Sequence, residues 1–138
     1  MTNQAQLLRT AFLAGAITDA LAVVPLLIPP VAKRLWGFDD PSDACRFAMD
    51  YAATLMLGWT GLLLWACQRP LERRFVAALT VFVIYGLVLT ESIAVYRGYL
   101  AAWRAVPTWC LQIVLLSLFG GGYHYATLRR WIPSWLIG

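Results

Sequence analysis

Four long apolar stretches, separated by short polar segments, dominate the pattern of the chain. None of them shows the alternation of polar and apolar residues over about ten positions that is typical of membrane β-strands. Each reaches the roughly 20 residues that a helix needs to cross the hydrocarbon core of a bilayer. A helix satisfies its own backbone hydrogen bonds, which water cannot do inside a membrane. The pattern therefore predicts four helical spans, at about residues 7–31, 44–67, 75–96 and 106–128.

The first connections carry residues that end or begin helices. Pro29–Pro30 predicts the end of the first span, because proline cannot donate the hydrogen bond that continues a helix. Residues 37–43 are expected to form a loop, in which Ser42 or Asp43 can cap the second span. Residues 68–74 form a short polar turn, which predicts that the second and third spans are antiparallel neighbours.

The last span is expected to begin with a proline and to end at the membrane surface. Gly98 opens the connection before it, and Pro107 suits its first turn. Residues 129–138 are amphipathic and aromatic, which favours a tail in the headgroup layer, where Trp is enriched. We therefore expect an all-α integral membrane protein, with residues 1–138 forming a single transmembrane domain. Its architecture would be a four-transmembrane-helix bundle with short loops.

Composition strengthens this interpretation. Of the residues, 61% are hydrophobic and 13% are charged, and the mean hydropathy is +0.67. A soluble domain usually carries about 25% charged residues. The composition excludes a disordered chain and a nucleic-acid-binding protein that works through a basic face. The expected surroundings are membrane lipids, and no nucleic-acid partner is expected.

Basic residues at the ends of the spans give a weak indication of orientation. Four spans place the N-terminus, the 68–74 turn and the C-terminus on one side, which carries six basic residues against five on the other. Because basic residues prefer the cytoplasmic side, this pattern favours cytoplasmic termini. The difference is small, so a dual topology stays open. The first side contains Arg9, Arg69, Arg73, Arg74, Arg129 and Arg130, and the outer side contains Lys33, Arg34, Arg46, Arg97 and Arg104.

Ionisable residues inside the spans are the main candidates for function. A charge at the bilayer centre costs about 2.5–3.5 kcal/mol, so such residues usually face protein or water. At about 1.5 Å per residue, Asp50, Glu91 and Gln112 lie roughly 9 Å below the outer ends of their spans. By the same rise Asp19 lies deeper, roughly 16 Å from Pro30. Arg46, one turn from Asp50, can form an ion pair with it.

The shared level of Asp50, Glu91 and Gln112 predicts a polar pocket in the outer half of the membrane, with Asp19 as its floor. Glu91 and Asp50 would contact the polar end of a ligand, such as an amine, or act as acid and base. Arg46 would tune Asp50. The predicted ligand-binding residues are Asp19, Arg46, Asp50, Tyr51, Glu91, Tyr96, Trp109 and Gln112.

Residues that recur every three or four positions predict the inward faces of the spans. Small residues on such a face allow membrane helices to approach closely. The predicted inward faces are Ala11, Gly15, Thr18, Ala22 and Pro25 in the first span; Asp50, Thr54, Gly58, Gly61 and Trp65 in the second; Ile84, Val88, Glu91 and Val95 in the third; and Thr108, Gln112, Phe119 and Tyr123 in the fourth.

Motifs for other chemistries are missing from the sequence. A single histidine, His124, excludes a bis-histidine haem or a histidine-rich metal site within one chain. Cys45, Cys67 and Cys110 form no C-x-x-C pair and are expected to be free thiols. No phosphate loop, zinc-protease or serine-hydrolase motif is present. We therefore expect no cofactor and no metal. Residues 120–122, all glycine, predict a kink or a close helix contact.

Three functions fit these observations. The first is binding of a hydrophobic or amphipathic small molecule in the intramembrane pocket, with or without acid–base chemistry. The second is a proton-coupled transporter that works as a homodimer through Asp19. The third is an accessory subunit of a larger membrane complex, in which Asp19 and Glu91 pair with another chain. The acids can also serve only to hold the helices together. The polar groups at one level favour the first function.

Overall fold

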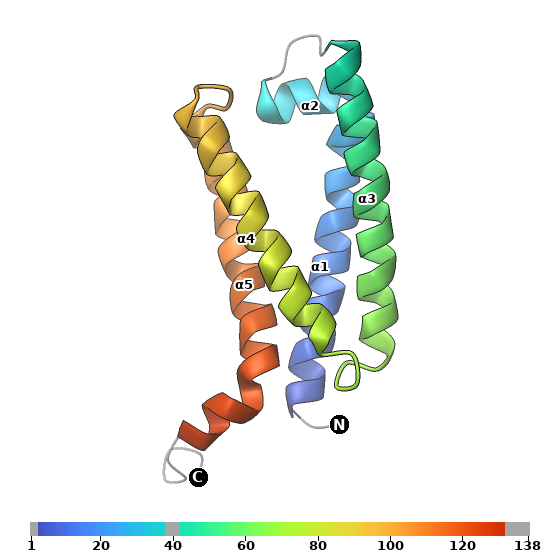
Figure 1. The fold of residues 1–138 in the computed structure, drawn as a ribbon, viewed down its shortest axis with the longest axis vertical. Coiled ribbons are helices and arrows are strands. Elements are labelled where there is room, and N and C mark those ends of the chain that lie inside the picture. The colour runs from blue at the N-terminus through green and yellow to red at the C-terminus, as the bar shows by residue number, and fades with distance from the viewer. Residues whose placement is uncertain (1–2, 38–41, 132–138) are drawn as a thin grey trace.

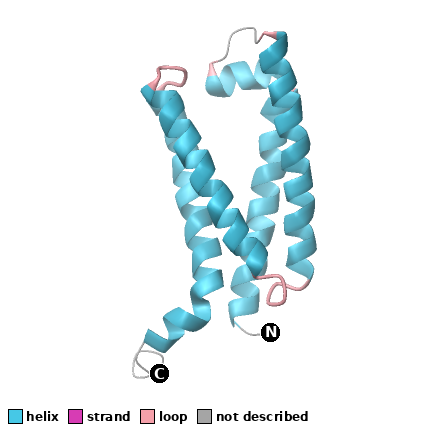
Figure 2. Ribbon diagram, in the orientation of Figure 1, coloured by secondary structure: helices cyan, strands magenta, loops and turns pink. Residues whose placement is uncertain are grey.

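The computed structural model describes residues 3–37 and 42–131, with side chains as far as residue 124. These residues form five helices and no strand (Figures 1 and 2). Four of the helices are long and apolar enough to cross a membrane, which agrees with the predicted all-α integral membrane protein. In chain order the helices are α1 (Asn3–Leu27), α2 (Pro29–Trp36), α3 (Asp43–Gln68), α4 (Phe75–Tyr96) and α5 (Ala102–Trp131).

Helix α2 is the element that the sequence pattern did not predict. The first span ends at Leu27 rather than near residue 31, just before the prolines that were predicted to end it, and Pro29–Pro30 also begins a new helix. Proline suits this position because the first N–H groups of a helix have no partner inside the helix. The helix ends at Gly37, which has a φ of 80° and donates its N–H to the carbonyl of Lys33 at 2.9 Å. These proline and glycine positions were visible in the sequence.

Helix α5 is longer at both ends than the predicted fourth span. It begins at Ala102 rather than near residue 106, so Pro107 lies in its second turn. It continues to Trp131, into the start of the predicted interfacial tail, and residues 132–138 of that tail lie outside the described residues. Figure 1 shows that α5 changes direction in its C-terminal part.

Two of the predicted connections are confirmed by their local contacts. The Cys45 N–H donates to the Ser42 hydroxyl at 3.3 Å, so Ser42 caps α3. Gly98 has a φ of 76° and lies in the connection between α4 and α5. In the turn before α4, Arg73 donates to the Trp65 carbonyl, and its guanidinium lies 3.7 Å from the centre of the Trp65 ring.

The helices pack as two pairs, α1 with α3 and α4 with α5, and the pairs are joined mainly by α1 and α5 (Figure 1). Helices α3 and α4 contact each other only sparsely. The prediction that the second and third spans are antiparallel neighbours therefore holds for their direction but not for packing along their length. The reason is that α1 and α5 provide the main surfaces on which α3 and α4 pack.

The two pairs meet around an aromatic contact at the half of the molecule near the N-terminus. The buried rings of Phe12 and Phe119 lie 5.8 Å apart. A Cβ atom on Gly15 would lie 2.8 Å from Phe119 Cζ and 3.1 Å from Leu63 Cδ1. A Cβ atom on Gly122 would lie 2.8 Å from a Leu8 methyl, so the predicted close contact at the glycine run is confirmed. Glycine allows this approach of the membrane helices.

The inward faces of α1, α4 and α5 largely follow the predicted spacing, whereas the prediction for α3 is wrong. Asp50, Thr54, Gly58, Gly61 and Trp65 form a largely exposed face of α3. This helix packs on α1 and has little contact with α4, so only one of its faces is covered. The residues that α3 buries are Met49, Ala53, Leu63, Ala66 and Cys67.

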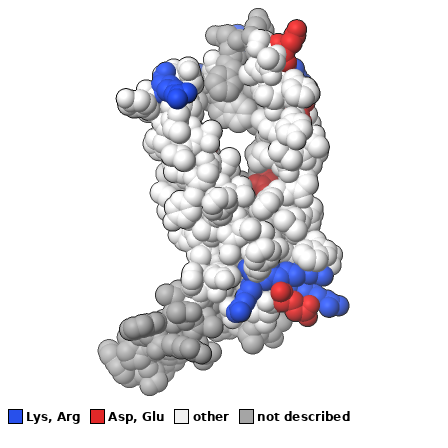
Figure 3. Space-filling model, in the orientation of Figure 1, with Lys and Arg blue, Asp and Glu red and all other residues white. Residues whose placement is uncertain are grey.

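The outer surface suits a lipid environment. Large apolar side chains such as Ile17, Phe82 and Leu89 are more than half exposed. The charged side chains of the described residues gather toward the two ends, and the middle of the face in Figure 3 is almost uncharged. Hydroxyl groups on the spans donate to carbonyls four residues earlier in their own helix, which satisfies them where water is absent. These are the hydroxyls of Thr54, Thr60, Thr80, Thr90, Ser92 and Ser117.

Candidate functional site

The candidate site lies where the two helix pairs part. From the Phe12–Phe119 contact toward α2, the pair α4–α5 diverges from the pair α1–α3 (Figure 1). Figure 3 shows that the surface is hollowed between the pairs, with acidic atoms visible at the inner edge of the hollow. We use "the hollow" for this space, bounded by α1 and α3 on one side, by α4 and α5 on the other, and by α2 at its end.

Asp19 lies on the side of α1 that faces α5. It follows Phe12 by seven residues. This separation is about 20° short of two full helical turns, and it corresponds to a rise of about 10.5 Å along the helix. It therefore lies above Phe12 on the same face, at the point where α5 has begun to diverge. The Asp19 side chain is partly buried, and no described side chain forms a hydrogen bond or an ion pair with it.

Gln112 occupies the matching position on α5. It precedes Phe119 by seven residues, and α5 runs antiparallel to α1, so it also lies about 10.5 Å from the aromatic contact on the side of α2. Its side chain is only 4% exposed, and its Oε1 atom has no hydrogen-bond partner among the described residues. The expectation that Asp19 lies below Gln112 is therefore corrected. The depths were counted from Pro30 and Val106, whereas the helices end and begin at Leu27 and Ala102.

Glu91 adds a second acid next to Gln112. The side chains of Gln112 and Trp109 lie beside the Glu91 carboxyl, where they can donate to it. The pairing is incomplete, because Glu91 Oε2 and Trp109 Nε1 are both buried without a partner at hydrogen-bond geometry in the described structure. Glu91, Trp109 and Gln112 therefore form one contact between α4 and α5, as the predicted common level of Glu91 and Gln112 suggested.

Trp59 is a residue that the sequence analysis missed. The close approach of Gly15 and Leu63 fixes the register of the antiparallel helices α1 and α3. One turn from this contact toward α2 lie Asp19 on α1 and Trp59 on α3. The Trp59 Nε1 atom is buried and has no partner among the described residues. A tryptophan inside a span is itself the signal that could have identified it, because a buried indole N–H usually has a partner.

These five residues lie near one level. Four of them carry one buried polar atom without a hydrogen-bond partner among the described residues, and the fifth, Asp19, is partly buried without a partner. We use "the polar cluster" for Asp19, Trp59, Glu91, Trp109 and Gln112. It lies next to the closed half of the bundle, at the level where the helix pairs begin to diverge. Four helices contribute to it, namely α1, α3, α4 and α5.

Arg46 and Asp50 form a separate ion pair outside the polar cluster. Arg46 Nη2 lies 3.6 Å from Asp50 Oδ1, which confirms the predicted pairing. The same nitrogen donates to the Leu27 carbonyl at 2.8 Å and so helps to end α1. The Asp50 side chain is 51% exposed on α3, because only one face of that helix is covered. The structure thus does not bring this pair to Glu91.

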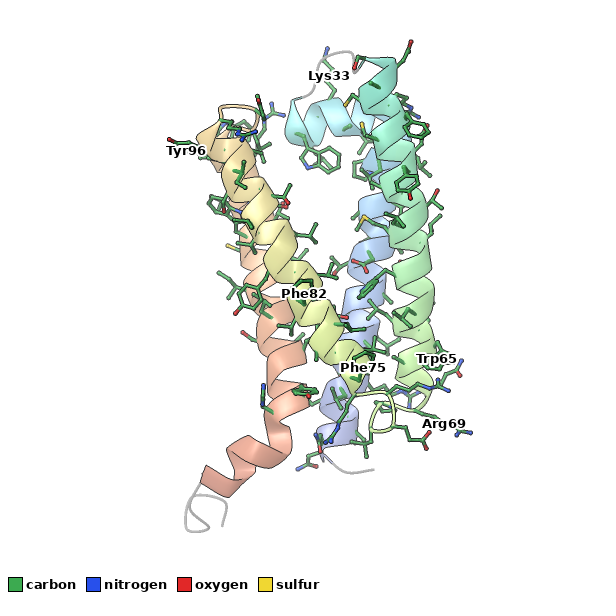
Figure 4. The ribbon with its side chains drawn as sticks, viewed as in Figure 1. Lys33, Trp65, Arg69, Phe75, Phe82 and Tyr96 are labelled. Atoms are coloured by element: carbon green, nitrogen blue, oxygen red, sulfur yellow. The ribbon has the colours of Figure 1, made fainter. Side chains whose placement is uncertain are left out.

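The two predicted tyrosines also lie apart from the polar cluster. Tyr51 is 62% exposed and stacks on Phe47, with ring centres 6.3 Å apart. Tyr96 is 91% exposed and projects from the end of α4, away from α1 and α3 (Figure 4). Four of the eight predicted ligand-binding residues therefore belong to the polar cluster: Asp19, Glu91, Trp109 and Gln112.

Helix α2 joins the two helix pairs at the end of the hollow. Arg104 at the start of α5 donates from Nη1 to the carbonyls of Lys33 and Arg34, at 3.3 and 3.4 Å. A cation suits this position because the C-terminal carbonyls of a helix carry partial negative charge. A Cβ atom on Gly37 would lie only 2.7 Å from Arg104 Nη1, so glycine also makes room for the guanidinium.

The other candidate residues for chemistry are not gathered into a site. Within the described residues, no group of three or more His, Cys, Asp or Glu side chains could hold a metal ion. Cys45, Cys67 and Cys110 are free. His124 is exposed and meets the Tyr123 ring edge-on, with centres 5.0 Å apart.

No family model matches the chain, and neither the curated proteins nor the solved structures contain a significant match to it. Functional inference for this protein therefore comes from the polar cluster and the hollow.

Proposed function

We propose that the protein binds a hydrophobic or amphipathic small molecule in the hollow, with the polar end of the molecule at the polar cluster. The observation that carries this proposal is Asp19, a partly buried acid that has no hydrogen-bond or ion-pair partner among the described residues and lies at the level where the helix pairs diverge. Each buried polar group without a hydrogen bond costs about 1–3 kcal/mol. A bound molecule whose polar end pairs with Asp19 would recover that cost, and the apolar walls of the hollow would bury the rest of the molecule.

The proposal accounts for the polar cluster more directly than a homodimeric transporter does. In the dimer hypothesis, the small residues of the spans form the contact between subunits. The small residues of α1 are already covered within one chain, because Phe119 and Leu63 pack against Gly15. Asp19 faces the inside of the same chain. Both features favour a site within one subunit.

A photoreactive hydrophobic probe tests the proposed site. Purified protein in lipid nanodiscs would be irradiated with an alkyl diazirine, and the modified residues would be identified by mass spectrometry. We expect saturable modification around Asp19 and Gln112, which an excess of an unlabelled amphiphile suppresses. Modification of lipid-facing residues such as Phe82 and Leu89 serves as the internal control and should not saturate. Modification of the lipid-facing residues alone would contradict the proposed function.

A further inference from the structure

Arginines gather at the end of the molecule that holds the turn between α3 and α4. We use "the arginine cluster" for the four arginines of this end: Arg9, Arg69, Arg73 and Arg74. Three of them lie in the turn itself, and the Arg9 carbonyl lies 3.9 Å from the Sγ atom of Cys67, near the end of α3. Figure 3 shows basic atoms grouped at this end around a few acidic atoms. Within residues 3–12 and 62–78 the only acid is Glu72, so this end carries an excess of positive charge.

The turn is short and folded back on itself. Six residues, 69–74, connect the two helices, and the Arg73 N–H donates to the Arg69 carbonyl at 3.1 Å. The Arg73 guanidinium lies 3.7 Å from the centre of the Trp65 ring and donates to the Trp65 carbonyl. It thereby satisfies one of the last carbonyls of α3, which have no partner inside the helix. The turn therefore keeps its arginines next to the ends of the two spans.

The arginine cluster has accessible N–H donors and charges that the protein does not balance. Arg69 Nη1 lies 3.3 Å from Glu72 Oε2, and the two side chains are 66% and 67% exposed. Arg9 and Arg74 are exposed, and neither forms an ion pair with a described residue. A guanidinium group presents five N–H donors in a planar fork, which binds a phosphate with two parallel hydrogen bonds. The surface therefore suits a phosphate anion.

Exposed aromatic side chains lie between the arginines and the middle of the spans. Trp65 near the end of α3 is 48% exposed, and Phe75 at the start of α4 is 64% exposed. Figure 4 shows both closer to the middle of the molecule than Arg69. Tryptophan is enriched where acyl chains meet polar headgroups. The order of aromatic rings and then arginines toward the end of the molecule matches the order of acyl chains and phosphate in a lipid.

We propose that the arginine cluster binds the phosphate group of an anionic phospholipid, whose acyl chains lie along the exposed apolar sides of α3 and α4. This surface is separate from the hollow and goes beyond the proposed function. The short turn and the exposed rings of Trp65 and Phe75 favour a lipid over an acidic protein segment, because they place the charges directly beside apolar surface. The predicted orientation places this end on the cytoplasmic side, where the membrane surface is negatively charged.

Native mass spectrometry with defined lipids tests this proposal. The purified protein, in a neutral detergent, would be titrated with an equimolar mixture of dioleoyl phosphatidylglycerol and dioleoyl phosphatidylcholine. These lipids share their acyl chains and differ in headgroup charge and in mass, so the first bound lipid can be identified. The ratio of the two singly bound species gives the relative affinity. We expect a preference of about fivefold for phosphatidylglycerol, the effect of an arginine near an anionic headgroup.

Two double variants with the same change in charge locate the site. Arg69→Gln/Arg74→Gln should abolish the preference for phosphatidylglycerol, and it leaves Arg73 in place to hold the turn. Arg34→Gln/Arg97→Gln is the matched control, because it removes two exposed arginines from the opposite end of the molecule, and it should leave the preference unchanged. Arg69→Lys/Arg74→Lys should retain more of the preference than the glutamine pair, because lysine keeps the charge but not the forked donors.

Two results would overturn the proposal. The first is equal binding of both lipids by the unaltered protein. The second is an equal loss of preference in the two glutamine variants, since the preference would then follow net charge rather than the arginine cluster. Circular dichroism and size-exclusion chromatography would verify folding. If Arg69→Gln/Arg74→Gln does not fold, Arg74→Gln alone decides, because the exposed Arg74 side chain has no ion-pair partner among the described residues, and an unchanged preference in this variant would contradict the proposal.

Discussion

Asp19 on α1 and Gln112 on α5 lie on one level, each seven residues from the ring contact of Phe12 with Phe119 and on the same side of it. Below this level the helices are held together by close packing, with Gly15 against Phe119 and Gly122 against Leu8. Above it the two pairs diverge toward α2 (Figure 1). Of the buried side-chain atoms without partners in the described residues, Arg46 Nη1 lies near the end of α1, and the other four lie at the boundary between the closed and the open half of the bundle.

Replacing Gln112 with methionine should raise stability and weaken ligand binding at the same time. Gln112→Met removes a buried amide oxygen that has no partner, together with one donor beside Glu91, and keeps a side chain of similar length. We expect the free energy of unfolding to rise by about 1 kcal/mol. Unfolding in a mixed detergent series would measure this change. Thr80→Val is the control, because the buried Thr80 hydroxyl already donates to the Val76 carbonyl at 2.8 Å and no unsatisfied group is removed.

A loss of stability in Gln112→Met would have a different meaning. It would show that Gln112 mainly holds α4 and α5 together through Glu91, and it would favour a structural role for the acids.

Two glycines in similar helical positions should respond in opposite directions to alanine. Gly15→Ala would place a Cβ atom 2.8 Å from the buried Phe119 ring, so we expect a loss of about 1–3 kcal/mol from overpacking. Gly58→Ala meets no atom within 4 Å and should gain about 0.5–1 kcal/mol from the lower backbone entropy of the unfolded chain. The same detergent unfolding experiment compares them. Equal effects of the two substitutions would contradict the packing of α1 against α5.

Removing the contact between Arg104 and α2 should loosen the end of the hollow. Arg104→Met removes the donor to the Lys33 and Arg34 carbonyls. We expect backbone amide exchange in residues 32–37 to become about tenfold faster, from the loss of hydrogen bonds to a charged group. Arg97→Met, which removes an exposed charge from the same end of the molecule, is the matched control and should leave exchange in α2 unchanged. Unchanged exchange in Arg104→Met would show that α2 is held by other contacts.

The predicted orientation can be tested with two engineered cysteines. Exposed residues 74 and 97 precede and follow α4, so they lie at opposite ends of a span. In a background without native cysteines, Arg97→Cys should react with a membrane-impermeant maleimide in intact cells. Arg74→Cys should react only after the membrane is permeabilised, because the basic residues favour cytoplasmic termini. The reverse pattern would contradict this orientation, and reaction of both in intact cells would indicate a dual topology.

The apolar stretches predicted the four long helices because length and hydropathy are local properties. Ser42, Gly98 and the Arg46–Asp50 pair were also predictable, since each depends on residues within one turn. Helix α2 was missed although its signals were local. The prolines were predicted to end the first span, and α1 does end just before them, at Leu27; that they also begin a new helix was not predicted.

The arrangement of the helices could not be derived from spacing alone. A stripe of small residues on α3, including Gly58 and Gly61, is as suitable for packing as the stripe on α1. Only the three-dimensional structure shows that α3 has one neighbour along its length and leaves that stripe exposed. Because α3 packs mainly on α1, Asp50 and Tyr51 are exposed on α3 and do not belong to the predicted pocket. The predicted depth of Asp19 was inaccurate because it was counted from the predicted end of the first span. A hydrophobic pattern locates such helix ends only to within a few residues.

Native mass spectrometry of the protein released from nanodiscs tests the central claim most directly. The account predicts a chain that carries a discrete small-molecule adduct, with an occupancy that falls in Asp19→Asn and in Gln112→Met and is unchanged in Asp50→Asn. A chain without any adduct, or an adduct that all three variants retain equally, would contradict binding at the polar cluster.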